Sequence, residues 1–153
     1  MYKGNLIAVK DMEKSKKFYQ DILGMKIVGD FGANVQLDGG LFLQTLDSWK
    51  NFISGRNISL QHNAGELYFE DPDIEQFCQK LRSFQVEYVH ELIEHRWGQR
   101  VVRFYDPDYH IIEVAEDITM VVKRFFRSGM SEEQVALRMD VPLDYVKECL
   151  KQE

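Results

Sequence analysis

The same order of secondary-structure elements occurs twice in this 153-residue chain, and this internal repeat limits the folds that the chain can adopt. In each copy a short β-prone run precedes an amphipathic helix, and three further short strands follow. The first copy begins with NLIAV and the helical pattern DMEKSKKFYQDILG, and the second begins with ELYFED and a helix opened by DPDIEQ. The repeat predicts an α+β protein with two βαβββ modules, residues 1–62 and 63–117.

Turn signals separate the remaining strands of each copy. The expected strands are MKIVGDF, NVQLD and LFLQTL in the first copy, and VEYVH, RVVRFY and HIIEVAE in the second. We expect Asp11 to cap the first helix and Gly24 to end it. The segment DSWKNFISGRN between the copies is expected to be a polar loop.

The two copies can be aligned residue by residue. KDMEK falls on PDIEQ, and LFLQTLD falls on HIIEVAE. In this register Gly4 corresponds to Glu66, and Gln44 corresponds to Glu113. Four positions thus stand out, in two pairs.

This duplicated arrangement, which ends in YDPDYHIIEVAE, resembles the vicinal oxygen chelate superfamily, which includes glyoxalase I, bleomycin and fosfomycin resistance proteins and extradiol dioxygenases. The resemblance covers residues 1–117 and rests on VKDMEKSKKFYQDILGMKI, ELYFED and WGQRVVRFYDPDYHIIEV. It implies that the modules form an open barrel-like arrangement around a cavity. One difference is Tyr109, which stands where the turn of the family usually has Gly. The positions that carry metal ligands in the family are Gly4, Gln44, Glu66 and Glu113.

The resemblance also implies a cofactor, one divalent ion of Mn, Ni, Zn, Fe or Mg, because these cations fit His, Gln and Glu ligands. Gly4 has no side chain to offer, so the candidate metal ligands are Gln44, Glu66 and Glu113. If the protein is an enzyme, Glu66 and Glu113 are the candidate catalytic residues that move a proton. The alternative is a protein that works without a metal.

Two carboxylates that converge in a cavity repel each other and lose hydration, so they need a partner. Arg100 and Arg103 lie three residues apart on one expected strand, and their side chains therefore point to opposite faces. We expect one of them to face inward. A pairing of either arginine with Glu113 would favour a binding or structural role over metal chemistry.

Several aromatic and polar residues are placed where a pocket could use them, and a mostly apolar lining with few polar groups is usual for small-molecule sites. Trp97 is followed by Gly98, which permits a tight bend, so this loop could form a lid or a wall of the pocket. The candidate ligand-binding residues are Gln44, Tyr68, Trp97, Arg100, Arg103, Phe42, Phe104, His62 and His95.

Residues 118–153 have a helical pattern and form an expected extension of three helices. Ser131 and Gln134 have the spacing of a capping box. The layout resembles a helix-turn-helix, but the segment contains six acidic and six basic side chains, which makes nucleic acid an unlikely partner. We expect the apolar residues of this extension to dock on the barrel or on a second subunit: Val121, Val122, Phe125, Val135, Leu137, Val146 and Leu150.

The net charge of −6 also argues against nucleic-acid binding. The two cysteines have no metal-site spacing, and no run of apolar residues is long enough to span a membrane, so we expect a cytoplasmic protein. The resemblance implies a homodimer. We expect a small-molecule-binding protein of the glyoxalase/bleomycin-resistance type with a degenerate metal site. The alternatives are a metal-dependent lyase or isomerase of glyoxalase I type, a related dioxygenase, and a ligand sensor with a helix-turn-helix-like tail.

Overall fold

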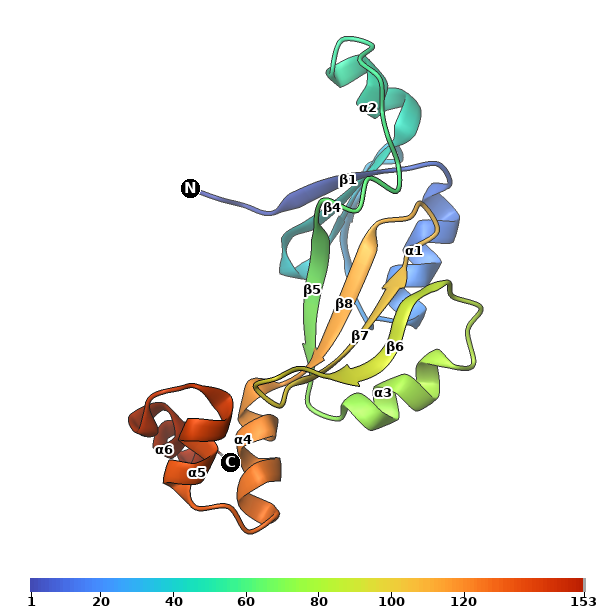
Figure 1. The fold of residues 1–153 in the computed structure, drawn as a ribbon. Helices are drawn as coiled ribbons and strands as arrows, with labels where there is room; N and C mark the ends of the chain where they lie inside the picture. Colours follow the sequence, from blue (N-terminus) through green and yellow to red (C-terminus); the bar gives the residue numbers. More distant parts are fainter. Residues whose placement is uncertain (153) are drawn as a thin grey trace. The chain divides into compact units, whose positions relative to one another are not determined.

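The computed structural model describes residues 1–152 and confirms an α+β fold with the repeated βαβββ order (Figure 1). The described chain forms two compact units. One contains residues 1–66 and 105–111, and the other contains residues 67–104 and the chain from 112 onward. No helix within residues 1–152 combines the length and the apolar character needed to cross a membrane.

The first sheet has the strand order β1-β4-β3-β2. β1 is parallel to β4, whereas β3 is antiparallel to both of its neighbours. The 3-10 turn Asp38–Gly40 leads into the last strand. The elements of this unit are β1 (Asn5–Val9), α1 (Met12–Asp21), β2 (Ile27–Asp30), β3 (Asn34–Leu37), β4 (Leu41–Thr45) and α2 (Leu46–Phe52).

Helix α1 begins as the sequence predicts, because the side chain of Asp11 accepts a hydrogen bond from the backbone N–H of Lys14. Its apolar side is buried at Tyr19 and Ile22. The expected loop at DSWKNFISGRN is wrong in its first half, where α2 forms. Leu46, Trp49 and Phe52 recur every three residues in this segment, which is the helical signal that its polar residues obscure.

The second sheet has the strand order β5-β8-β7-β6. Asp73 caps α3, and the predicted inner stripe of that helix is buried. β6 begins two residues later than the predicted strand and continues to Glu94. The elements are β5 (Glu66–Asp71), α3 (Ile74–Leu81), β6 (Tyr88–Glu94), β7 (Arg100–Tyr105) and β8 (Ile111–Glu116).

The turn that precedes β8 is built around the buried carboxylate of Asp106. This carboxylate accepts hydrogen bonds from the backbone N–H groups of Asp108 and His110 and, at 2.7 Å, from the hydroxyl of Tyr19. Tyr109 has a φ of 67°, in the left-handed region that favours Gly. The turn therefore keeps the conformation in which Gly is favoured, although a tyrosine occupies the position.

Three helices follow β8, and they have a hydrophobic core of their own. They are α4 (Ile118–Arg127), α5 (Glu132–Met139) and α6 (Leu143–Lys151), and the predicted capping box of Ser131 and Gln134 is confirmed. Leu137 is 84% exposed, so it does not dock on the barrel within this chain, and its docking on a second subunit stays a prediction. The buried cluster contains residues of these helices alone: Val121, Val122, Phe125, Val135, Ala136, Met139, Val146 and Cys149.

Candidate functional site

Gly4 precedes β1, and the backbone around it leaves no room for a side chain. A Cβ atom built on Gly4 overlaps the carbonyl oxygen of Gly40 and lies 2.9 Å from the ring of Phe42. Real Cβ atoms do not approach other heavy atoms this closely. Gly4 therefore does more than lack a ligand, because neighbouring backbone fills the space that a side chain at this position would need.

Gln44 lies on β4, and its side-chain amide is already engaged. It is only 3% exposed. Its carbonyl oxygen accepts a hydrogen bond from Asn34 at 2.8 Å, and its amide nitrogen donates to the hydroxyl of Ser48. Ser48 in turn bonds Thr45 at the start of α2, so the side chain of Gln44 has a structural role in holding that turn.

Glu113 lies on β8 and is 5% exposed, and its carboxylate forms an ion pair with the guanidinium of Arg103 on β7. Arg103 also contacts the ring of His90, its cross-strand partner on β6, at 3.2 Å. Arg103 is thus the arginine that pairs with Glu113. The buried carboxylate in this apolar strand is accounted for by a neighbouring positive charge.

Glu66, Tyr68 and Glu70 alternate along β5 and form its exposed side, while Leu67 and Phe69 are half-buried on the other side. The hydroxyl of Tyr68 donates a hydrogen bond to Glu70 at 2.6 Å. Burial and this carboxylate raise the pKa of Tyr68 above its ordinary value, so the hydroxyl stays protonated at neutral pH. The result is an exposed phenol beside carboxylates.

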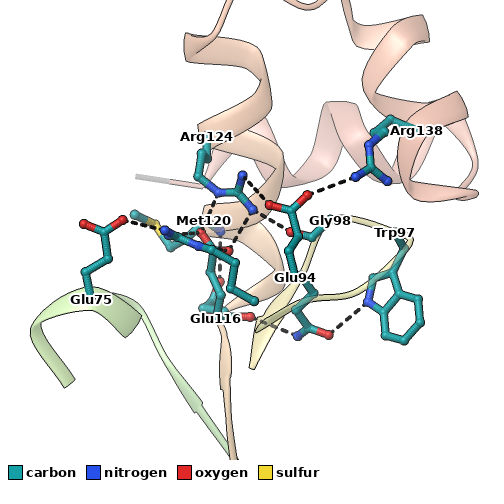
Figure 2. Close-up of polar contacts among 11 residues, drawn as sticks. Glu75, Glu94, Trp97, Gly98, Glu116, Met120, Arg124 and Arg138 are labelled. Carbon is teal, nitrogen blue, oxygen red and sulfur yellow. Dashed lines mark hydrogen bonds and ion pairs between the residues drawn. The ribbon is translucent and has the colours of Figure 1, made fainter. Parts of the chain in front are cut away.

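Arg100 faces the opposite side of the sheet from Arg103, as its spacing predicts. It forms two hydrogen bonds with the carboxylate of Glu116, at 3.0 and 2.9 Å, and one with Glu75 of α3. Arg124 of α4 binds the same carboxylate through two further bonds of 3.0 Å (Figure 2). Glu116 therefore joins the second sheet to the helical extension.

The pKa of Glu116 reflects two opposing effects. Its side chain is 3% exposed, and burial alone would raise its pKa. The hydrogen bonds and charges of Arg100 and Arg124 outweigh burial and hold the pKa below its ordinary value. The same contacts raise the pKa of Arg100 further above its usual range. Sequence reasoning missed Glu116 as a key residue, because its partner Arg124 lies in the helical extension.

The loop with Trp97 is tied to this cluster by hydrogen bonds. The carbonyl of Gly98 accepts a hydrogen bond from Arg124 (Figure 2). The carbonyl of Arg96 accepts one from Arg138. The indole of Trp97 donates to the side chain of Gln99 at 3.1 Å. Gly98 has a φ of 90° and packs so closely on Phe125 that a Cβ atom there would overlap the ring.

The remaining predicted pocket residues lie in different surroundings. Phe104 is fully buried, with its ring centroid 6.3 Å from that of Phe77 on α3, so it belongs to the core. Phe42 is half-buried next to Gly4. The exposed side chain of His62 accepts a hydrogen bond from the backbone of Ala64, and the ring of His95 stacks on Trp97 at 4.4 Å.

The four aligned positions, taken one by one, do not fit a divalent ion. Gly4 has no space for a ligand, Gln44 is held by neighbouring side chains, and the charge of Glu113 is neutralised by an arginine. Only Glu66 presents an exposed carboxylate. Within residues 1–152, no three His, Cys, Asp or Glu side chains are grouped so that they could hold a metal ion.

Comparisons with known proteins agree with this architecture. Residues 2–119 match the family model of a glyoxalase-like domain. A protein of unknown function from Agrobacterium tumefaciens str. C58 is 37% identical, with a TM-score of 0.70 over 76% of this chain and 94% of that one. Two structures at 18% identity share the fold. They are a lactoylglutathione lyase from Agrobacterium tumefaciens (TM-score 0.62; 77% and 94% covered) and a glyoxalase-related enzyme from Fulvimarina pelagi (0.66; 78% and 89%). No curated protein matches the sequence.

Proposed function

Because the chain belongs to the glyoxalase-like domain family, we propose that it binds a small, partly apolar molecule without the help of a metal ion. The ion pair between Arg103 and Glu113 is the observation that carries this proposal. An ionised carboxylate that already faces a guanidinium is a poor ligand for a cation, since the arginine repels the incoming charge. The binding surface in this proposal is the exposed side of β5 in the second module, residues 63–117.

The exposed side of β5 indicates the chemistry of the ligand. Tyr68 offers an aromatic ring that is 53% exposed, and the carboxylates of Glu66 and Glu70 lie on the same side of the strand. A ring flanked by negative charges favours a cation through its electrostatic field and through cation–π attraction. We therefore propose an apolar molecule that carries a protonated amine.

Calorimetric titration with two probes of the same shape and opposite charge tests this proposal. Phenethylamine should bind about tenfold more tightly than 3-phenylpropionate, a difference of ~1.4 kcal/mol. Glu70→Gln should remove most of this preference, whereas Glu87→Gln, an exposed site outside β5, should leave it unchanged. Equal binding of the two probes, or a preference for the anion, would refute the proposed ligand class.

We also propose that the chain forms a homodimer, as its family resemblance implies. Light scattering coupled to size-exclusion chromatography should give twice the mass of 18.0 kDa. A monomer at micromolar concentration would contradict the dimer without affecting the proposed binding chemistry.

A further inference from the structure

The exposed side of β5 is connected to the helical extension through one buried side chain, Gln99. Its amide nitrogen donates to the hydroxyl of Tyr68 at 3.3 Å and to the backbone carbonyl of Glu116 at 2.9 Å. Its carbonyl oxygen accepts from Trp97. Gln99 is only 7% exposed, so a hydrogen bond that it loses is not readily replaced by water.

The loop that contains Gln99 also holds α4. The backbone of Gln99 accepts a hydrogen bond from His95, and the neighbouring carbonyl of Gly98 accepts one from Arg124. Phe125 packs directly on Gly98. A shift of this loop therefore alters the contacts that hold α4.

The attachment of the three helices is largely polar, and their buried apolar side chains form one cluster. Arg138 of α5 bonds Glu94 of β6 at 2.9 Å, and Arg124 bonds Glu116 (Figure 2). Arg138 also bonds the carbonyl of Arg96. Polar attachments of this kind resemble transient interfaces more than hydrophobic cores. Loosening of α4–α6 from the sheet therefore breaks these polar bonds and the contact of Phe125 with Gly98.

A second connection runs from β5 to α6. Glu70, the acceptor of the Tyr68 hydroxyl, is also close enough to Tyr145 of α6 to influence its ionisation. Burial and the neighbouring Cys149 raise the pKa of Tyr145, and the charges of Glu70 and Asp117 add to this rise.

We propose that ligand occupancy at Tyr68 loosens the docking of α4–α6, with the loop from His95 to Gln99 as the coupling element. A ligand that hydrogen-bonds to the Tyr68 hydroxyl competes with Gln99, whose bond to Tyr68 is the longest of its three side-chain bonds. The loop then shifts so that the side-chain amide of Gln99 finds another hydrogen-bond acceptor. This shift weakens the contacts of Gly98 with α4. This inference rests on the proposed function only for the identity of the ligand. The helices thereby report whether the site is occupied.

Hydrogen exchange of the full chain, measured by mass spectrometry, tests the coupling without any ligand. Tyr68→Phe removes the hydroxyl that Gln99 contacts, and amides of residues 118–151 should exchange several-fold faster than in the wild type. Tyr88→Phe is the matched control, since Tyr88 is a partly buried strand tyrosine of the same sheet, and it should leave this region unchanged. Arg124→Met, which breaks the direct attachment of α4, shows the exchange rates of loosened helices.

Two further comparisons decide the outcome. In a Gln99→Leu background, Tyr68→Phe should have no additional effect, because the coupling residue is gone. Phenethylamine should accelerate exchange in residues 118–151 of the wild type but not of Gln99→Leu. Unchanged exchange in Tyr68→Phe, while Arg124→Met exchanges faster, would overturn the coupling. If phenethylamine does not bind at all, the proposed ligand class fails, but the Tyr68→Phe result still decides the coupling.

Discussion

The guanidinium of Arg103 and the carboxylate of Glu113 form an ion pair across two neighbouring strands of the second sheet. Glu113 occupies a position that carries a metal ligand in the superfamily that the sequence resembles. In this protein the partner of the carboxylate is an arginine. The pair neutralises the buried charge of Glu113 within β8.

Removal of Arg103 should destabilise the protein, because the buried charge of Glu113 then has no partner. Arg103→Met leaves Glu113 buried without a counter-charge, and the free energy of unfolding should fall by about 2–3 kcal/mol, somewhat less than for a fully buried pair. The double variant Arg103→Met, Glu113→Leu should regain most of this loss. Urea denaturation measures the free energy of unfolding of the single and double variants. A single variant as stable as the wild type would show that the pair does not stabilise the fold.

A histidine introduced at Gly4 should not create a metal ligand at that position. Gly4→His must displace the carbonyl of Gly40, so it should lower the melting temperature and should not raise the metal content of the protein. Gly65→His is the matched control, because no atom lies within 4 Å of a Cβ atom at that position. A stable Gly4→His protein that binds one ion per chain would disprove the steric argument.

Acid should weaken the attachment of α4 through Glu116. Because its pKa is depressed in the folded protein, its contribution is present above the ordinary glutamate pKa of about 4.3 and is lost as the pH falls through the lower, folded value. Melting temperatures between pH 3 and 7 should therefore show a decline at the acid end that is smaller in Glu116→Gln. The exposed-site variant Glu87→Gln should keep the wild-type profile, and identical profiles for all three proteins would contradict this role.

The left-handed conformation of Tyr109 predicts an order of stability. Tyr109→Gly should be at least as stable as the wild type, because Gly adopts positive φ without strain, although the contact with the ring of Tyr105 is lost. Tyr109→Val should be about 1–2 kcal/mol less stable than Tyr109→Gly, since a β-branched side chain is strained there. Chemical denaturation that ranks Val level with Gly would rule out strain at this turn.

The separate core of the three helices can be tested by two truncations on α5. Met139→Ala removes a buried side chain and should cost about 2–5 kcal/mol. Leu137→Ala removes an exposed one and should change stability by less than about 0.5 kcal/mol. If Leu137→Ala were as damaging as Met139→Ala, Leu137 would have to pack against a surface that the structure does not contain.

The sequence predicts the elements of this fold better than it predicts the partners of its polar residues. Helix starts at Asp11, Asp73 and Ser131 follow from local capping chemistry, which depends on residues three positions apart. The order of strands and helices along the chain follows from the repeat. Helix α2 was missed because a seven-residue helix has too few turns to show a clear period among polar residues.

The site was harder to predict, because strand register and helix docking decide which charges meet. The spacing of Arg100 and Arg103 correctly placed them on opposite faces, but it could not say which one meets Glu113. The bond between Glu116 and Arg124 joins a strand to a helix whose direction no local pattern defines. The sequence nevertheless held a signal for this pair. Glu116 is an acidic residue at the end of β8, and Arg124 is a basic residue in the helix that follows, α4.

The metal content of the untagged protein tests the central claim most directly. Elemental analysis should follow dialysis against Mn, Ni, Zn and Fe, with a Glu66→Gln, Glu113→Gln double variant treated in parallel. The account predicts far less than one ion per chain in both proteins, because Gly4, Gln44 and Glu113 do not offer free ligands. About one ion per chain in the wild type, lost in the double variant, would contradict it and restore metal-dependent catalysis as the function.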